Sequence, residues 1–269
     1  NFKLIIIKYM KNLENKYLKI ANECAEASGK ILKKYFRKKI KIERKSDNSP
    51  VTKADKEAEK IIRNIIIKKA PECGFFGEES GKFNTSNEYV FVVDPLDGTK
   101  GFVSGKPLFC TLIGLMKNNK PYIGVLNQPI LNERWSGIAN KETKYNNTKI
   151  RTTKCKKLKG LRMYATSPMM FKGKNQRVYK SVRSKINECL FGLDSYSHGM
   201  LSAGFVDVVL EANLKPYDYI ASAAVISGAG GKLTDWNGDE LNLESDGRIL
   251  AAGDPKIHKQ LLKVIQKVK

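Results

Sequence analysis

The segment EYVFVVDPLDGTKGF, residues 88–102, joins a run of apolar residues to a loop rich in acidic and turn-forming residues. Tyr89–Val93 is a continuous run of β-branched and aromatic residues, which is typical of a strand buried on both faces. Pro95 lacks a backbone donor and is expected to end the strand, and Gly98 permits a turn that other residues resist. The sequence therefore predicts a buried strand that stops at Asp94.

Asp94 and Asp97 place two carboxylates three residues apart at the carboxyl end of that strand. Like charges this close repel each other unless a cation lies between them. A hard divalent ion such as Mg²⁺ is the simplest such cation, because it prefers oxygen ligands. An ordinary Asp-Gly turn would explain this motif alone. It would not explain two further acidic segments, GEES at 77–80 and PYD at 216–218, so we interpret the three together as one site.

The composition limits the class of protein. The chain has 269 residues, 41% of them hydrophobic, which suffices for one large domain or two fused halves. It carries 49 basic and 27 acidic residues, for a net charge of +22 spread along the whole length. This charge suits anionic ligands, although a general lysine-rich composition is the simpler explanation. Because no nucleic-acid-binding motif accompanies the charge, no specific nucleic-acid partner is expected.

The cysteines and the N-terminal segment bear on the compartment. The five cysteines are far apart and form no CxxC pair, which favours reduced thiols in the cytoplasm. The apolar patch Leu4–Ile7 is too short for a signal sequence or a membrane span, so no membrane partner is expected. The chain begins at Asn1, and Met10 is a candidate start site, which would leave residues 1–9 outside the functional protein.

Hydrophobic periodicity and turn signals predict alternating helices and strands. Apolar residues at helical spacing predict a helix over 12–36, followed by a polar segment, 38–49, with a strand and a loop. Thr52 and Asp55 have the spacing of a capping box for a helix that stops before Pro71. Further strands are predicted at 75–77, 111–116, 122–126, 134–139, 161–165, 206–210, 233–235 and 249–252. Further helices are predicted at 176–186, 198–204, 220–227 and from Pro255.

The polar run 141–159 is the best candidate boundary inside the chain. We therefore expect a single catalytic domain made of two fused halves, 1–145 and 146–269. The first half would hold the GEES and DPLDGT segments. The second would hold Asp218 and the residues that select the substrate, with glycines at 228–231 ending the helix that Asp218 opens.

GEES (77–80), DPLDGT (94–99) and the Asp218 segment with Gly230-Gly231 together resemble the inositol monophosphatase superfamily. The resemblance covers nearly the whole chain and implies an α/β (α+β) fold, a layered αβαβα sandwich. It also implies a lithium-sensitive, Mg²⁺-dependent phosphomonoesterase with two or three ions per site, commonly a homodimer. Tyr217 stands where the familiar branches often have Trp, and Leu96 where they often have Ile.

Carried over position by position, the resemblance implies a ligand set and catalytic roles. The metal ligands would be Glu78, Asp94, the carbonyl of Leu96, Asp97 and Asp218, with Asp94 shared between two ions and a weaker third ion near Glu78. Such a pair of metals can clamp the attacking and leaving oxygens of an in-line displacement. Thr99, oriented by Asp55, would position the attacking water, and Glu78 would act with them. Gly98 and Thr99 would offer backbone N–H groups to the phosphate, near Asp97 and Asp218.

The second half resembles the histidinol-phosphate phosphatases of this superfamily more closely. The segments of that half that fit this branch are FVDVVLEANLKPYDYIASAAVISGAGGKLTDWNG (205–238), ATSPMMF (165–171) and AAGDPKIHKQLL (251–262), and QPILNERW (128–135) in the first half also fits it. The leading hypothesis is therefore hydrolysis of histidinol phosphate in histidine biosynthesis. Inositol monophosphate, another sugar phosphate and a nucleotide bisphosphate stay open as substrates. A nucleic-acid- or polymerase-associated binding protein on the same fold is the alternative from another class.

Two further carboxylates are candidates for substrate choice. Glu211 lies seven residues before Asp218, at the end of a predicted strand. Asp194 lies in the segment GLDSY (192–196), which resembles the histidinol branch. Histidinol phosphate carries an ammonium group opposite its phosphate, and two carboxylates near that end would attract it. The alternative is that Asp194 is an ordinary surface or turn residue.

Overall fold

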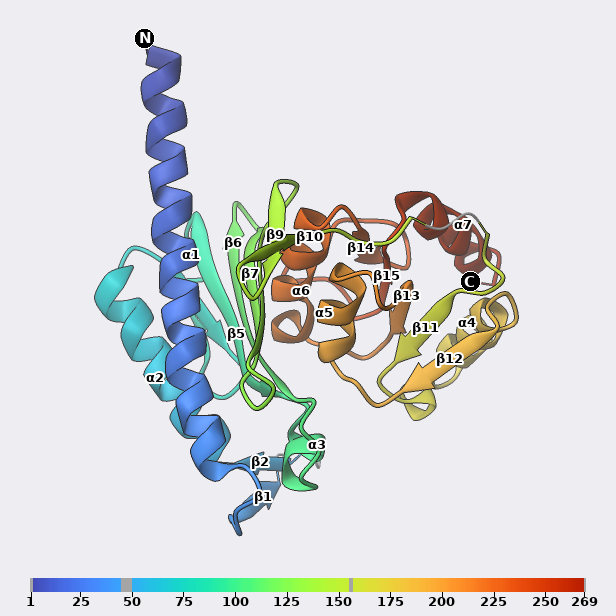
Figure 1. The fold of residues 1–269 in the computed structure, drawn as a ribbon, viewed down its shortest axis with the longest axis horizontal. Helices are drawn as coiled ribbons and strands as arrows, with labels where there is room; N and C mark the ends of the chain where they lie inside the picture. The colour runs from blue at the N-terminus through green and yellow to red at the C-terminus, as the bar shows by residue number, and fades with distance from the viewer. Residues whose placement is uncertain (1, 45–49, 155–156, 269) are drawn as a thin grey trace.

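A computed structural model describes residues 2–44, 50–154 and 157–268 of the chain. Helices and sheets alternate in five layers (Figure 1). Helices α1 (Phe2–Tyr35) and α2 (Lys53–Lys69) cover one face of the first sheet, and α5 (Tyr196–Ser202) and α6 (Pro216–Gly228) lie between the two sheets. Helices α4 (Lys174–Arg183) and α7 (Pro255–Gln266) form the outer layer of the second half. The expected αβαβα sandwich is therefore confirmed.

Within the described residues the first sheet has eight strands in the order β10-β9-β8-β7-β6-β5-β3-β4. Strands β3 and β5 run parallel, and the other neighbours run antiparallel. The strands are β3 (Gly74–Gly77), β4 (Gly81–Phe83), β5 (Tyr89–Asp97), β6 (Cys110–Lys117), β7 (Lys120–Gln128), β8 (Glu133–Ile138), β9 (Glu142–Tyr145) and β10 (Thr148–Ile150). Strand β5 is buried almost throughout because helices cover both faces of the sheet.

The second sheet has five strands in the described residues, in the order β12-β11-β13-β15-β14. Strand β11 runs parallel to both of its neighbours, whereas β13, β15 and β14 pair antiparallel. The strands are β11 (Arg162–Ala165), β12 (Glu188–Phe191), β13 (Val208–Glu211), β14 (Lys232–Asp235) and β15 (Ile249–Ala252). The short elements are β1 (Ile42–Arg44), β2 (Pro50–Thr52), α3 (Thr99–Val103) and a 3₁₀ turn at Pro168–Met170.

The N-terminal helix and the polar run 141–159 differ from their predictions in the first half. Helix α1 begins at Phe2, so the predicted start near residue 12 was wrong, and the segment before Met10 continues the same helix. The loop predicted over 38–49 extends into residues 45–49, which lie outside the described residues. Strands β9 and β10 fall within the polar run 141–159, and the first sheet therefore extends to Ile150. The division into halves at residue 145 stays a prediction.

Strand β5 does not stop at Asp94 as predicted but continues to Asp97 through a bulge. Asp94 pairs with Leu112, whereas Asp97 pairs with Cys110, so three residues on β5 span the space of two on β6. Pro95 fits within this irregular segment because its missing N–H is not needed there. Its carbonyl accepts a hydrogen bond of 2.9 Å from the Thr111 hydroxyl. The proline therefore marks the bulge and not the end of the strand.

Helix α6 lies very close to the first sheet. A Cβ atom added at Gly124 would lie 2.0 Å from the carbonyl oxygen of Ala221, and one at Gly137 would lie 2.7 Å from the Cα of Val225. Both distances are too short for any side chain, so the two strands admit only glycine at these points. The helix is made mostly of small and apolar residues, and almost all of them are buried. This packing fixes the position of the helix that begins beside Asp218.

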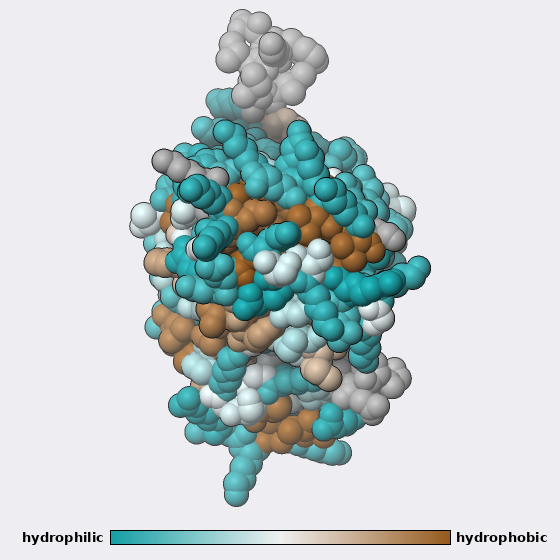
Figure 2. All heavy atoms as spheres, turned by 90° about the vertical axis from the view of Figure 1, so that its right-hand side faces the viewer, coloured by the Kyte–Doolittle hydropathy of each residue, from teal (hydrophilic) through white to brown (hydrophobic). Residues whose placement is uncertain are grey.

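The molecular surface is mainly polar. On the face turned toward the viewer in Figure 2, hydrophilic areas predominate and the apolar areas are separated from one another. The large apolar residues exposed in the second half are Met169, Leu190, Phe191 and Phe205. Among the described residues, no helix combines the length and the apolar character that crossing a membrane requires.

Candidate active site

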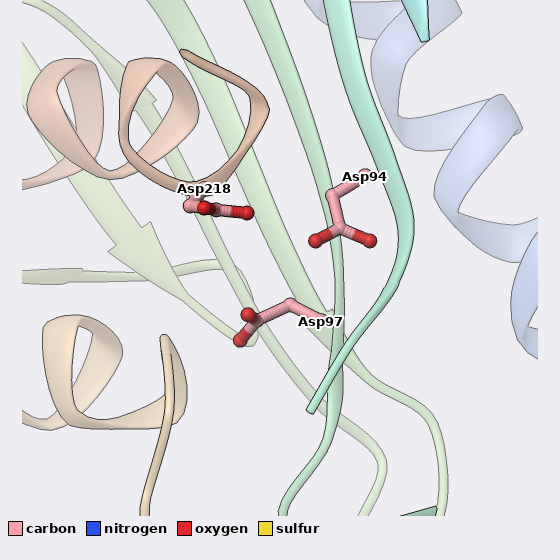
Figure 3. A group of neighbouring side chains, drawn as sticks. All are labelled: Asp94, Asp97 and Asp218. Carbon is pink, nitrogen blue, oxygen red and sulfur yellow. The ribbon is translucent and has the colours of Figure 1, made fainter. Parts of the chain in front are cut away.

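Three aspartates from distant parts of the chain meet between the first sheet and α6. One carboxylate oxygen from each of Asp94, Asp97 and Asp218 lies within 4.8 Å of the others. Figure 3 shows Asp94 and Asp97 coming from β5 and Asp218 from the first turn of α6, with their carboxylates turned toward a common space. The structure therefore brings together three of the five predicted metal ligands as one cluster.

The bulge in β5 explains how two of these side chains share a side of the sheet. In a regular strand, residues three apart point to opposite faces. Here the partners of Asp94 and Asp97 on β6 are only two residues apart, so both aspartates fall on the same face. Two backbone N–H groups hold them: that of Leu96 donates to Asp94 Oδ1 at 2.8 Å, and that of Ser195 donates to Asp97 Oδ2 at 2.7 Å.

The third aspartate is held by the start of α6. Pro216 lies in the first turn, where its missing N–H leaves no intrahelical bond unmade. The Lys215 N–H donates to Asp218 Oδ2 at 2.7 Å, in the manner of a helix cap. One oxygen of Asp218 is thus used by the backbone, and its carboxylate remains turned toward Asp94 and Asp97.

Burial and mutual repulsion raise the pKa values of all three carboxyl groups. The pKa of Asp94 lies well above its usual range because of burial and then of the charges of Glu78, Asp97 and Asp218. Burial, followed by Asp194 and Asp218, raises the pKa of Asp97 in the same way. Burial raises the pKa of Asp218 to about 7, although the Lys215 N–H opposes the shift. Groups that repel this strongly favour either protons or a bound cation.

Glu78 adjoins the cluster at the end of β3. Its charge raises the pKa of both Asp94 and Asp218, and its N–H donates to the carbonyl of Val93 on β5 at 3.1 Å. The turn that follows is held by Glu59, a buried residue of α2 that the sequence analysis did not select. Glu59 accepts hydrogen bonds from the N–H groups of Glu79 at 2.8 Å and Ser80 at 2.7 Å. Its position four residues after Asp55, on the same helical face, was the available signal.

Thr99 lies beside the cluster at the start of α3. Its hydroxyl is 3.1 Å from Asp55 Oδ1 and 3.0 Å from the carbonyl oxygen of Leu96. The other oxygen of Asp55, Oδ2, accepts from the Thr52 N–H at 2.8 Å and the Thr52 hydroxyl at 2.6 Å. The predicted capping box is therefore confirmed, and the same carboxylate also contacts Thr99. Burial raises the pKa of Asp55, against the effect of the bonds from Thr52.

Asp194 approaches the turn between β5 and α3. It has a left-handed backbone conformation, with φ of 47°, and a Cβ atom added at Gly98 would lie 3.1 Å from its Oδ2. Gly98 itself has φ of 87°, the conformation that the sequence assigned to it. The pKa of Asp194 is raised by burial and by Glu211, and lowered by the charges of Lys106 and Lys100. The carboxylate therefore lies at the site and not in a remote surface turn.

Glu211 ends β13 and is almost completely buried, with 2% of its surface exposed. Its Oε1 accepts from the N–H of Thr166 at 3.1 Å and from the Thr166 hydroxyl at 2.5 Å. Its Oε2 lies 3.3 Å from Nε2 of His198. Burial tends to raise the pKa of Glu211, but His198 and Thr166 hold it below the usual value. Neither His198 nor the Ser195 N–H is evident from the sequence, because neither belongs to an acidic motif.

The donor set fits a hard divalent cation. The cluster consists of carboxylates, the ligands that Mg²⁺ prefers, and includes no thiolate or imidazole. Burial and the neighbouring carboxylates raise the pKa values of Asp94 and Asp97, and a bound cation would offset both effects. The carbonyl of Leu96, the remaining predicted ligand, accepts from the Thr99 hydroxyl. The arrangement suits a site where oxygen ligands hold cations against a phosphate.

An acidic cluster between the first sheet and α6 of an αβαβα sandwich fits a phosphatase of the inositol monophosphatase type. The sequence profile of the inositol monophosphatase family matches residues 13–269, and the chain belongs to this family.

Three proteins with related activities are similar to the chain over most of its length. It is 43% identical over 261 residues to the bifunctional phosphatase IMPL2, chloroplastic, of Arabidopsis thaliana, covering 94% of this chain and 75% of that protein. It is 28% identical to a histidinol-phosphatase of Chlorobaculum parvum, covering 87% and 91%. A solved inositol monophosphatase from Zymomonas mobilis superposes with a TM-score of 0.86 at 36% identity, covering 94% and 98%.

Proposed function

We propose that this phosphatase is a Mg²⁺-dependent phosphomonoesterase that hydrolyses histidinol phosphate to histidinol and phosphate. Family membership supports the phosphatase activity, and the carboxylate cluster supports the use of divalent cations. The observation that carries the choice of substrate is the pair Asp194 and Glu211. The charge of Glu211 raises the pKa of Asp194. Both carboxylates also act on the aspartate cluster, since the charge of Asp194 raises the pKa of Asp97 and that of Glu211 raises the pKa of Asp218.

Different residues would bind the cations and position the attacking water. Asp94, Asp97, Asp218, Glu78 and the Leu96 carbonyl would hold the cations. When bound, magnesium would neutralise the charge of the phosphate and activate water for in-line attack. Thr99 would accept or donate a hydrogen bond to that water, with Asp55 fixing the direction of its hydroxyl.

The acidic pair supports an amine-bearing substrate on electrostatic grounds. A carboxylate pair attracts the ammonium group of histidinol phosphate and repels a second phosphate, such as that of a nucleotide bisphosphate. Burial and the charge of Glu211 raise the pKa of Asp194, and the charges of Lys106 and Lys100 oppose this rise and so favour the ionised form. The similarity to a named histidinol-phosphatase supports the same substrate.

Inositol monophosphate is the second candidate. The solved inositol monophosphatase that superposes on the chain favours it, because the two share the fold over almost their full lengths. A polyol has no charge to pair with Asp194, and hydrogen bonds to its hydroxyl groups would have to replace an ion pair.

A phosphate-release panel tests the proposal. Purified protein with Mg²⁺ is given histidinol phosphate, inositol 1-phosphate and adenosine 3′,5′-bisphosphate in parallel. The proposal requires the highest kcat/KM on histidinol phosphate. A higher value on inositol 1-phosphate would reject the substrate while keeping the class. No hydrolysis of any phosphomonoester, together with tight binding to RNA at physiological salt, would favour the nucleic-acid- or polymerase-associated alternative.

The proposal includes a homodimer in the cytoplasm, acting in histidine biosynthesis. The described cysteines Cys24, Cys73, Cys110 and Cys189 are free, which supports a reducing compartment. Light scattering during size-exclusion chromatography measures the mass directly, against 30.2 kDa for one chain. A fluorescent fusion of the full gene product reports the compartment.

A further inference from the structure

A histidine that takes no part in the chemistry described above lies behind Glu211. His198, on α5, is completely buried. Its Nδ1 is 2.9 Å from the hydroxyl of Ser222 on α6, and its Nε2 is 3.3 Å from Oε2 of Glu211 on β13. The Nε2 contact has the distance of an ion pair without the alignment of a hydrogen bond. Three elements therefore meet at one imidazole.

The contacts of His198 complete the surroundings of Glu211. Thr166 occupies Oε1 through two hydrogen bonds, and His198 lies at Oε2, so polar groups contact both oxygens of this carboxylate. An ionised carboxylate buried to this degree is costly unless polar groups surround it. With both oxygens in contact with fixed groups, the carboxylate has one orientation.

The same contacts join the substrate carboxylates to the aspartate cluster. Ser222 lies one helical turn after Asp218, so both are on one face of α6. Ser195, which immediately precedes α5, donates its N–H to Asp97. A displacement of His198 would therefore move Glu211 relative to the aspartates on either side of it.

We propose that His198 is a positioning residue that fixes Glu211 for recognition of the leaving-group end of the substrate. The inference rests on the proposed function in one respect, namely that Glu211 faces that end. Nothing in it requires His198 to touch substrate or to transfer a proton. Its effect is expected in KM, and not in the attack on phosphorus.

Two substitutions of His198 separate positioning from packing. Gln can place a donor near the position of Nε2, whereas Leu fills a similar volume without polar atoms. We expect His198→Leu to raise KM for histidinol phosphate about tenfold, as for losing the alignment of a charged contact. We expect His198→Gln to recover most of that loss. The kcat/KM for an aryl phosphate, which has no ammonium group, should change less than twofold in either variant.

A double-mutant cycle tests whether the effect passes through Glu211. If His198 acts by holding Glu211, the double variant His198→Leu/Glu211→Gln should have the same KM as Glu211→Gln alone. Ser202→Ala serves as the control on α5, because its hydroxyl donates to the helix carbonyl of His198 and leaves the imidazole and Glu211 untouched. This control should leave KM unchanged. Ser222→Ala, a milder change, should raise KM in the same direction by a smaller factor.

Several results would overturn the inference. Additive increases in the cycle would mean that His198 acts independently of Glu211. Equal losses of activity on the aryl phosphate would assign His198 to the metal site. A His198→Gln protein that melts like wild type but has a KM as high as that of His198→Leu would exclude positioning. If wild type prefers inositol 1-phosphate, the proposed substrate fails. The cycle is then measured with that ester, and non-additivity still decides the role of His198.

Discussion

The two oxygens of Asp55 accept hydrogen bonds from different residues: Oδ1 lies 3.1 Å from the Thr99 hydroxyl, and Oδ2 accepts from the N–H of Thr52 at the start of α2. A helix cap and a candidate catalytic group are thus the same side chain. The sequence posed these as competing interpretations of Asp55, and the structure is compatible with both at once. Stability and turnover should therefore change together at this residue, and separately at its two neighbours.

Substitutions at the three residues should separate the two effects. Thr99→Ala should lower kcat at least a hundredfold with little change in melting temperature, because the hydroxyl contributes nothing to the cap of α2. Asp55→Asn should lower kcat and also cost about 1 kcal/mol of unfolding free energy. Thr52→Ala is the matched control and should lower stability by a similar amount with kcat nearly intact. A paired melt and rate assay measures all three, and a fully active Thr99→Ala enzyme would contradict the assigned role.

Removing one carboxylate of the cluster should silence the enzyme. Asp94→Asn is expected to reduce kcat by on the order of 10³-fold or more, because the proposed site shares this group between two cations. Removing metal from wild type with EDTA should have the same effect, and added Mg²⁺ should restore activity. Asp246→Asn, at an exposed ion pair with Arg248, is the control. Activity of Asp94→Asn within tenfold of wild type would reject the two-metal assignment.

Asp194 gives the cleanest test of amine recognition. Asn tolerates the left-handed conformation that residue 194 adopts, so Asp194→Asn removes the charge without straining the backbone. We expect KM for histidinol phosphate to rise about tenfold or more, and hydrolysis of an aryl phosphate to change much less. Glu211→Gln should act in the same direction, but it also disturbs the contacts with Thr166 and His198. Equal losses on both substrates would show that Asp194 supports the metal site instead.

His258 should make the stability of the protein depend on pH. Burial, and then the charge of Lys232, lowers its pKa to about 4, and its Nε2 lies 3.0 Å from the Thr234 hydroxyl. The folded pKa lies below the unfolded value of about 6.5, so the unfolded chain binds more protons in the interval between them. Stability is therefore lost as pH falls through that interval, by about 2 kcal/mol between pH 7 and pH 5. Urea unfolding of wild type and His258→Gln measures this, and equal pH slopes would contradict it.

Local sequence signals predicted most of the fold. The strand Tyr89–Val93, the cap at Thr52 and the helix from Pro255 all follow from short-range composition and capping rules. Strand β12 was missed because it is a short edge strand with mostly exposed residues and no alternation. The start of α1 was placed too late, because the apolar patch before Met10 does not continue the amphipathic spacing that follows it.

The candidate site was predicted only where its residues lie in motifs. The aspartates, Thr99 and Glu78 belong to short acidic or turn segments, and the family resemblance supplied their roles. Glu59 holds the turn that follows Glu78, and its helical spacing from Asp55 was the signal available for it. His198 contacts Glu211 from a different element, and nothing in the sequence indicates that contact. The bulge was also missed, since its effect depends on how β5 pairs with β6 and not on β5 alone.

Because α6 lies so close to the first sheet, the spacing of the site carboxylates depends on residues that take no part in catalysis. Gly124 lies against the backbone of α6 at Ala221, about one helical turn after Asp218. Even one methyl group there would have to push the helix outward and carry Asp218 with it. Backbone packing in the core thus fixes the distances between the site carboxylates. A conservative Gly124→Ala change would alter these distances without removing any carboxylate.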